Sequence, residues 1–473
     1  MPTPKSRKPN LDSVTTINPD GSHFILHPAD VHGRFTTWRR IVAILLIVVY
    51  VAMPWIQING APAIFLDVEM RRFHIFGLTL VPQDLWVMFF AISGLGFLLF
   101  VVTAVLGRIW CGWACPYTVF LEHVFRVVER WLDGDAPARR KLAAAPWSPR
   151  KILKVSIREG IYLILAALIA HVFLSYFVSI PRLYSFMQAG PFDHLTAFTS
   201  VFLLTAALYF CFAHFREQFC ILMCPYGRLQ SALTDDDTII IGYDEARGEP
   251  RGKATDLTAG HCIDCMRCVN VCPTGIDIRN GLQLECIGCS ACIDACDEIM
   301  TKLDRPTGLV RYDSMRGLAG QKRRILRPRL YAYFLLGLLG LTVLSLTAFF
   351  RAKPITAEIS RMRGPSFFQD PAVIRNHYQL RVFNKRNQPM NFEIKLKDAP
   401  VGYEITGSGQ TFVLEALKEI ARPVVVVVPL DAYTGPVMLE IEIHGQPGNA
   451  TVIQETKFLG PNPNAIHREP PTP

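Results

Sequence analysis

The sequence predicts a multi-domain membrane protein that combines a bundle of five transmembrane α-helices, a cysteine-rich segment and a C-terminal β-sandwich. Half of its 473 residues are hydrophobic and only 19% are charged, whereas about a quarter are charged in typical soluble domains. Five long apolar stretches, thirteen cysteines and a late run of alternating short strands support this fold class. The composition excludes a disordered chain and a wholly soluble enzyme.

Five stretches are long and apolar enough to cross a bilayer. About 20 apolar residues are needed, because roughly 30 Å of hydrocarbon is crossed at about 1.5 Å per residue. The stretches are Ile41–Ile58, Leu85–Leu106, Ile161–Ile180, Leu195–Ala213 and Leu330–Phe350. About forty mainly polar residues precede the first of them, which argues against a cleaved signal peptide. Several such stretches in one chain favour a membrane bundle over buried helices of a soluble core.

The distribution of lysine and arginine among the loops predicts the orientation. The first forty residues hold six of them and the 107–160 loop holds ten, whereas the 59–84 loop holds two and the 181–194 loop one. Basic loops stay in the cytoplasm, so the N-terminus is expected inside and the residues after Phe350 outside, in the periplasm. The net charge of +9 is then explained by residues flanking membrane helices, and no nucleic-acid partner is expected.

These features divide the chain into five parts. They are a cytoplasmic tail over 1–40, four helices in two hairpins over 41–213, a cytoplasmic segment over 214–329, the fifth helix over 330–350, and a periplasmic β-sandwich with its tail over 351–473. Alternating strands are expected at Tyr378–Phe383, Asn391–Lys397, Gln410–Leu414, Val424–Pro429, Val437–Ile443 and Thr451–Phe458. Short strands at this spacing indicate a β-sandwich. The first twenty residues and Pro461–Pro473 are expected to be loose tails.

The most specific pattern lies between the fourth and fifth helices, where two runs of four cysteines follow each other. Both have the spacing C-x2-C-x2-C-x3-C of bacterial ferredoxins that bind two 4Fe-4S clusters, in which the fourth cysteine of each run ligates the other cluster. One cluster is therefore assigned to Cys262, Cys265, Cys268 and Cys296, and the other to Cys286, Cys289, Cys292 and Cys272.

Two alternatives remain for these cysteines, namely a pair of zinc sites or disulfides. Zinc sites seldom interlock two runs of four cysteines, and a reducing cytoplasm disfavours disulfides. Pro273 follows the first run, but Asp297 follows the second, where proline is common. A carboxylate at that position is expected to lower the potential of the adjacent cluster. Two clusters indicate one-electron relay and not bond-making chemistry.

A second, shorter motif occurs twice, each time after an apolar stretch. Its copies are Cys111-Gly-Trp-Ala-Cys115-Pro-Tyr and Cys220-Ile-Leu-Met-Cys224-Pro-Tyr. Residues four apart share a helical face, so each copy is expected to present two sulfurs in one direction, and the following proline to free a carbonyl. Four thiolates suit Cu(I), with zinc or iron as competitors, and Met223 adds a weak thioether candidate. The alternative is that these cysteines are only small buried residues.

Three further features give weaker signals. Glu122, His123, Arg126 and Arg130 fall on an expected amphipathic helix at the membrane interface, whose apolar face meets lipid or core. His171 lies inside a span, where a bond to a neighbouring helix and a ligand role are both open. Cys211 is expected to serve packing.

Over nearly its whole length the chain resembles the cytochrome c oxidase accessory protein family (CcoG/FixG), which are membrane-bound polyferredoxin-type proteins. The resemblance rests on the order of the spans, both Cys-x3-Cys-Pro motifs, the double cluster run and the position of the sandwich. It implies an immunoglobulin-like sandwich and a bacterial inner-membrane protein that supports assembly of cbb-type oxidase. It further implies reduction of Cu(II) to Cu(I) at Cys111, Cys115, Cys220 and Cys224. The implied partners are a copper-exporting P-type ATPase, a copper chaperone, and oxidase subunits or assembly factors.

Two other functions stay open. The paired motifs and the cluster run also resemble membrane ferredoxins of nitrate and nitrous oxide reduction, which act as quinol-oxidising electron conduits. A third reading is a non-redox scaffold with structural clusters. The sandwich favours the assembly factor, since a conduit needs no external binding domain. The electron donor is not identified by the sequence, and a homodimer is compatible with it.

Overall fold

The fold is that of a computed structural model, which describes residues 25–58, 61–69, 71–80, 85–256, 258–351, 354–386, 388–406 and 411–462. Parts of three expected segments lie outside the described residues. They are the tail over the first twenty residues, nearly all of the tail over Pro461–Pro473, and Gln410 at the start of one expected strand. The described chain divides into two compact units, one with the long helices and the cysteine-rich segment and one with the sandwich.

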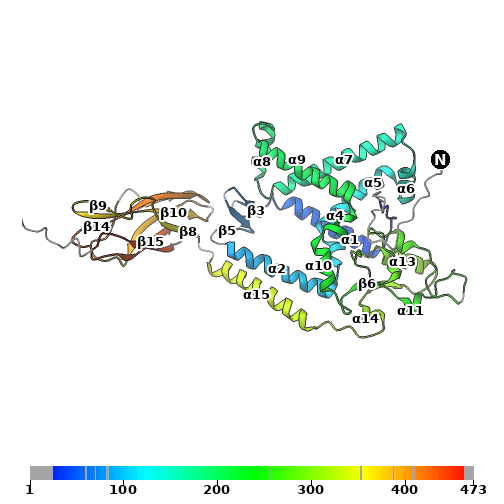
Figure 1. The fold of residues 1–473 in the computed structure, drawn as a ribbon. Coiled ribbons are helices and arrows are strands. Elements are labelled where there is room, and N and C mark those ends of the chain that lie inside the picture. Colours follow the sequence, from blue (N-terminus) through cyan, green and yellow to red (C-terminus); the bar gives the residue numbers. More distant parts are fainter. Residues whose placement is uncertain are drawn as a thin grey trace, which may run out of the picture. The chain divides into compact units, whose positions relative to one another are not determined.

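Five helices are long and apolar enough to span a membrane, which confirms the predicted number. They are α1 (Arg34–Ala52), α2 (Leu85–Leu106), α7 (Pro149–Leu174), α9 (Leu195–Tyr209) and α15 (Pro328–Arg351). In Figure 1, α7 runs beside α9 and α2 beside α15. Glycines allow α2 and α15 to approach each other closely, since a Cβ on Gly340 would lie 2.8 Å from the Cα of Gly94. Small residues are the usual means of close helix packing in lipid.

Two of these helices begin earlier than the apolar pattern predicts. The first starts at Arg34 and not Ile41, and the third starts at Pro149 and not Ile161. The third begins with ordinary start signals, because Ser148 accepts a hydrogen bond from the backbone N–H of Lys151 and proline occupies the first position. Counting only apolar residues therefore missed the polar first turns.

Short helices fill the connections between the long helices. They are α3 (Ile109–Trp113), α4 (Pro116–Phe120), η2 (Leu121–Phe125), α5 (Arg126–Asp133), α6 (Ala136–Ala144), α8 (Ile180–Ala189), η3 (Phe210–Phe215), η4 (Phe219–Met223) and α10 (Pro225–Leu233). The 59–84 loop, for which no strands were expected, carries β2 (Ala61–Pro62), β3 (Ile64–Asp67), β4 (Arg72–Ile75) and β5 (Leu78–Leu80). Strand β1 (Gln57–Ile58), which pairs with β2, occupies the last two residues of the first expected span.

The cysteine-rich segment is a small compact fold at one end of the helices (Figure 1). A two-stranded antiparallel sheet pairs β6 (Ile240–Tyr243) with β7 (Val310–Asp313). Between these strands lie α11 (Glu245–Gly248), α12 (Arg267–Asn270), η5 (Ile278–Asn280) and α13 (Ala291–Lys302), and α14 (Met315–Leu318) follows. Cysteines and aliphatic side chains form its core together.

The C-terminal region is a sandwich of two antiparallel sheets, which confirms the expected fold. One sheet has the order β12-β14-β10-β8 with β9 paired to β10, and the other β13-β11-β15-β16. The strands are β8 (Ile355–Arg361), β9 (Phe368–Gln369), β10 (Val373–Asn384), β11 (Met390–Lys397), β12 (Glu404–Thr406), β13 (Thr411–Leu414), β14 (Glu419–Pro429), β15 (Val437–Gln446) and β16 (Ala450–Phe458). Strands β8, β9 and β12 were not predicted. Alternating residues of both sheets fill one core.

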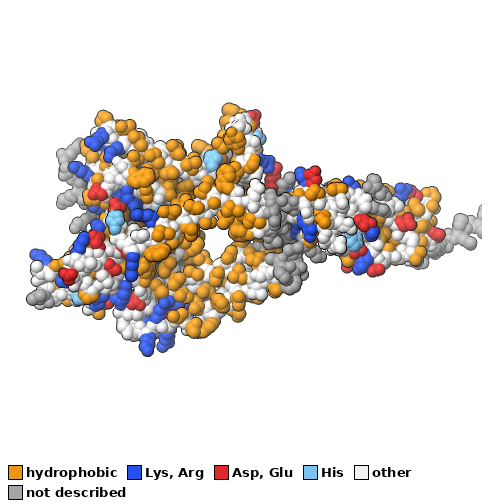
Figure 2. Space-filling view, turned by 180° about the vertical axis from the view of Figure 1, so that it is seen from behind, with side chains coloured by type: hydrophobic (Ala, Val, Ile, Leu, Met, Phe, Trp, Pro, Cys, Tyr) orange, Lys and Arg blue, Asp and Glu red, His pale blue; other side chains and the backbone are white. Residues whose placement is uncertain are grey.

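The surface of the helical unit agrees with a membrane protein. Figure 2 shows hydrophobic side chains over the long helices, with lysine and arginine gathered at the end that carries the cysteine-rich segment. Many exposed large apolar side chains belong to the five long helices, and apolar surface of this extent is stable only when something other than water covers it.

Candidate functional site

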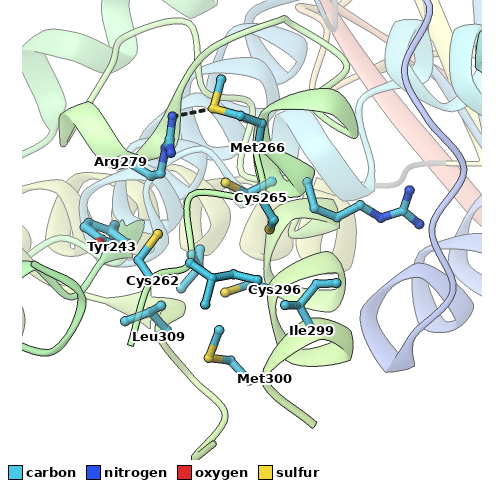
Figure 3. Close-up of a pocket in the computed structure, with 13 residues that line it drawn as sticks. Tyr243, Cys262, Cys265, Met266, Arg279, Cys296, Ile299, Met300 and Leu309 are labelled. Carbon is cyan, nitrogen blue, oxygen red and sulfur yellow. Dashed lines mark hydrogen bonds between the residues drawn. The ribbon is translucent and has the colours of Figure 1, made fainter. Parts of the chain in front are cut away.

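The cysteine-rich segment encloses two neighbouring cavities, each lined by four of the cysteines that spacing assigned to one cluster. A cavity of about 20 Å³ is lined by Cys262, Cys265, Cys268 and Cys296. Figure 3 shows three of these side chains, Cys262, Cys265 and Cys296, around this space. The other cavity, also about 20 Å³, is lined by Cys272, Cys286, Cys289 and Cys292. Cys268 lines both cavities.

The surroundings of these thiols fit iron–sulfur clusters. Backbone N–H groups donate hydrogen bonds to three of the sulfurs: Gly288 to Cys286, Ala291 to Cys289 and Val310 to Cys296. Such donors stabilise sulfur that carries negative charge. Among the residues that the structure describes, no group of three or more His, Cys, Asp or Glu is spaced to hold a single metal ion. The hydrogen bonds agree with sulfurs that carry negative charge, as the ligands of a cluster do.

A buried arginine beside the first cavity was missed by the sequence analysis. The Arg279 guanidinium lines this cavity, donates to Asp277 at 2.6 Å and pairs with Asp264. Its hydrogen bond to Asp277 raises the pKa of Arg279, so it keeps its positive charge. Asp297, expected to influence the cluster potential, accepts a hydrogen bond from the backbone N–H of Gly308 at 2.8 Å.

The local structure of the two Cys-x3-Cys-Pro motifs differs from the predicted single helical face. Cys111 lies in α3, which ends at Trp113, and Cys115 is the N-cap of the next helix. Cys220 lies in the π-helical turn η4, and Cys224 is likewise an N-cap. The proline in both copies begins a new helix, where a missing N–H has no cost. The explanation from i,i+4 spacing was therefore wrong.

The structure nevertheless places the four thiols near enough to influence one another, because the two motifs pack against each other, although no three ligating side chains among the described residues are grouped to hold a metal ion. Burial, followed by the nearby Cys115 thiol, raises the pKa of Cys111 to about 12, and Cys224 adds to this effect. Burial and the other three thiols raise the pKa of Cys220 in the same way. The Cys111 Sγ also donates to Oε1 of the buried Gln230, at 3.5 Å. By contrast, the Met223 side chain is 63% exposed.

Reciprocal hydrogen bonds hold the two motifs in this arrangement. The Tyr117 hydroxyl, from the first motif, lies 2.6 Å from the carbonyl oxygen of Arg216 before the second motif. The Tyr226 hydroxyl, from the second motif, lies 2.6 Å from the hydroxyl of Thr103 on α2. Arg108 also donates to the carbonyl of Gly227 at 2.7 Å. The tyrosine that ends each motif thus binds the other hairpin.

The first motif also touches the loop that carries the second group of cluster cysteines. A Cβ on Gly112 would lie 2.7 Å from the Ile287 carbonyl oxygen and 2.8 Å from the backbone nitrogen of Cys289. The buried Arg39 Nε donates to the Gly112 carbonyl at 3.0 Å. Trp113 donates to the Tyr312 hydroxyl at 3.1 Å, and that hydroxyl donates to Gly288 at 2.8 Å. Only a residue without a side chain fits at position 112.

The expected interfacial helix around Glu122–Arg130 has a buried polar face. Arg126 pairs with Glu122 and lies 3.1 Å from Glu217, and Glu129 lies 2.6 Å from Arg216. These charges are buried because η2 and α5 pack beneath η3 and the cysteine-rich segment. The apolar side chains Phe120, Val124 and Val128 pack into the core, which is one of the two expected environments, whereas the buried ion pairs were not expected. A hydrophobic pattern does not reveal buried ion pairs.

The first long helix is tied to the ligand helix α13. The Asp294 carboxylate, between Cys292 and Cys296, accepts from the backbone N–H and the hydroxyl of Thr36, both at 2.7 Å. It therefore caps the start of α1. His171 Nδ1 lies 2.7 Å from the carbonyl oxygen of Ala167 in its own helix.

Comparison with known proteins places these sites in a family. A 4Fe-4S dicluster domain matches residues 215–315, a 4Fe-4S binding domain matches 87–134, and the IG-like fold at the C-terminus of FixG matches 345–461. Protein RdxA of Cereibacter sphaeroides is 34% identical over 78% of this chain and 81% of its own length. The nitrogen fixation protein FixG of Rhizobium meliloti is 32% identical over 86% of both chains. The chain therefore belongs to the FixG family of membrane-bound iron–sulfur electron-transfer proteins.

Proposed function

We propose that this protein passes electrons one at a time to Cu(II) at the four motif thiols, and thereby supports assembly of a cbb-type cytochrome c oxidase. The observation that carries the proposal is the contact between Gly112, beside Cys111, and the backbone of Cys289. A cluster ligand and a motif cysteine are thus joined through touching backbone. This closeness favours electron transfer from the cluster assigned to Cys272, Cys286, Cys289 and Cys292 to the motif thiols.

In this proposal the eight cysteines of the two cavities hold two 4Fe-4S clusters, grouped as the cavities group them. When bound, the clusters supply one-electron relay. The protein contributes the N–H donors on the sulfurs and the Arg279 charge beside the first cavity. The motif thiols receive Cu(II), which takes up one electron and becomes Cu(I), an ion that soft sulfur ligands prefer. Binding displaces the proton that the buried Cys111 holds at neutral pH.

The proposed setting is the bacterial inner membrane. Both motifs and the cluster segment face the cytoplasm, as the basic loops indicate, and the sandwich faces the periplasm. Cu(I) then passes to a copper-exporting P-type ATPase or a copper chaperone, and the sandwich docks oxidase subunits or assembly factors. An external one-electron reductant in the cytoplasm supplies the electrons. These partners rest on the family resemblance alone.

The test uses the full chain, purified without oxygen and reduced with dithionite that is then removed. Cu(II) is added with a chromogenic Cu(I) chelator, and the variant replaces Cys111, Cys115, Cys220 and Cys224 with serine. We expect this quadruple variant to keep about eight irons per chain and to lose most of the Cu(I) signal. The control is Cys211→Ser, whose thiol is not in a motif, and it should react like the parent. Unchanged Cu(II) reduction by the quadruple variant would contradict the proposal.

A second occupant of the four motif thiols is favoured by one comparison. The matched 4Fe-4S binding domain over 87–134 contains Cys111 and Cys115 and no other cysteine. The same four thiols could then hold a third cluster that lies between the other two and the electron acceptor. Iron analysis separates the two cases, with about twelve irons per chain for three clusters and about eight for two. The quadruple serine variant should then fall from about twelve to about eight.

A further inference from the structure

A large cavity lies between the first long helix and the short helices that follow the first motif. Its volume is about 550 Å³, within the range of roughly 300–1,000 Å³ that small-molecule sites occupy. One wall is a face of α1 that includes Arg40, Ile44 and Ile47, and the opposite wall is the buried polar face of η2 and α5. Neither the electron relay nor the copper step uses this cavity.

The cavity is positively charged. The charged side chains that line it are Asp30, Arg39, Arg40, Glu122, Arg126, Arg130 and Arg139. Among these lining residues five arginines outnumber two carboxylates, while Glu129, Glu217 and Arg216 lie behind the wall and Asp294 binds the lining residue Thr36. Burial lowers the pKa of His123, which also lines the cavity, to about 4, so it adds no charge at neutral pH. The excess favours an anionic ligand.

Two of these arginines have hydrogen-bond donors without acceptors. The Nε atoms of Arg126 and Arg139 are buried, and no described residue accepts a hydrogen bond from either. Both side chains are almost completely buried. These Nε atoms have almost no accessible surface, so a ligand in the cavity cannot reach them, and the two guanidinium groups contribute through their positive charge. Arg40 and Arg130, at the more open side, can donate charge-assisted hydrogen bonds to an anion.

The side of the cavity formed by the membrane helix is apolar. Ile44 is 56% exposed, and Trp131 on the opposite wall is 81% exposed, as expected where a membrane protein meets the interface between lipid and water. A ligand with a phosphate and a long apolar part satisfies both sides. We propose that the cavity binds a phosphate group, and that its source is the headgroup of an anionic phospholipid whose acyl chains run along α1.

The bound phosphate would lie beside a cluster site. Pro273 and Ala291 line the cavity, and they are the sequence neighbours of Cys272 and Cys292, which line the second cluster cavity. A negative charge there disfavours an added electron on that cluster. The proposed site therefore gives an effect that a purely structural lipid would not produce, namely a lower reduction potential in anionic lipid.

The test compares the detergent-purified full chain with Arg40→Gln/Arg130→Gln, and uses Arg140→Gln as the matched control. Arg140 is an exposed residue on the same short helix as Arg139, and it does not line the cavity. Each protein receives phosphatidylglycerol or phosphatidylcholine in mixed micelles, or inorganic phosphate at matched ionic strength. Native mass spectrometry measures bound phosphate or lipid, and a redox titration followed by electron paramagnetic resonance measures the cluster potential.

The expected result is binding of phosphatidylglycerol by the parent and by Arg140→Gln, with about tenfold weaker binding by the double variant. The reduction potential of the cluster should be lower with phosphatidylglycerol than with phosphatidylcholine, and this difference should be absent in the double variant. Binding of inorganic phosphate that the double variant loses would support the phosphate site and identify the soluble ion as its source. Equal binding by the double variant, or equal affinity for both lipids, would overturn the proposal.

Discussion

At the scale of single residues, Gly112 decides how closely the first motif approaches the cluster loop. Its neighbours at this approach are the backbone atoms of Ile287 and Cys289, which cannot turn away as a flexible side chain would. Arg39 holds the same peptide by a bond to its carbonyl. A side chain here must separate the two backbones, and every further atom lengthens the path between the cluster cysteine and the motif thiol.

We expect Gly112→Val to slow Cu(II) reduction while the protein keeps its iron. Overpacking of this kind costs about 1–3 kcal/mol of folding free energy, so the variant should still fold, with a lower unfolding temperature. The rate after dithionite reduction and the iron content are measured on the same sample. Gly96→Ala is the matched control, since no atom lies within 4 Å of its added Cβ. A full rate in Gly112→Val would show that this contact does not carry the electrons.

At the scale of elements, buried ion pairs join the two helical hairpins. Glu129 on α5 binds Arg216, the residue that follows η3, at 2.6 Å, and the Tyr162 hydroxyl of α7 at 2.9 Å. Burial alone would raise the pKa of Glu129, but Arg216 and then Arg126 outweigh it and lower the pKa to about 2. The carboxylate is therefore charged in the folded protein, and its removal leaves buried guanidinium groups without their partner.

Glu129→Gln is expected to lower the free energy of unfolding by about 3–5 kcal/mol, as for other buried pairs that lose one member. The comparison is Glu69→Gln, whose pair with Arg182 is about half exposed and should contribute little to stability because solvent screens it. Thermal unfolding in detergent measures both. Equal effects of the two substitutions would contradict the structural role given to Glu129.

The ion pair between Glu129 and Arg216 also predicts that the stability of the protein falls at acid pH. The folded pKa of about 2 lies below the ordinary glutamate value of 4.5, so the stabilisation is complete above about pH 4.5 and is lost as the pH falls toward 2. The difference in unfolding temperature between the parent and Glu129→Gln should therefore shrink over that range. A constant difference from pH 5 to pH 3 would argue against a charged Glu129.

At the scale of the whole molecule, two units have separate cores. The sandwich core draws only on residues between Ile355 and Phe458, and the cysteine-rich core only on residues of the other unit. We expect a chain that ends at Arg351 to keep the iron content and Cu(II) reduction of the full protein. The isolated 354–462 fragment should fold as a β-protein by circular dichroism. Loss of iron from the shortened chain would show that the units depend on each other.

How far the sequence could predict the molecule depends on the range of the interactions. Cysteine spacing is a local constraint, so the eight cysteines could be assigned to two clusters from the sequence. The four of each set line one cavity, with Cys268 in both, and the ligand assignment stays a prediction. The apolar stretches predicted the five long helices for the same reason. The polar first turn at Arg34, the contact of Gly112 and the pair of Glu129 with Arg216 depend on packing between segments far apart in the chain. The hydrophobic periodicity of the sequence gives no signal of such packing.

The Asp294 cap has a consequence for biogenesis. This carboxylate lies between two cysteines of the ligand helix and holds the first turn of the first membrane helix. Starvation for iron or oxidative loss of a cofactor that unfolds α13 therefore also removes the N-terminal cap of α1. Damage at the metal centre would then reach the lipid-embedded part of the molecule, where quality-control proteases of the membrane could recognise it.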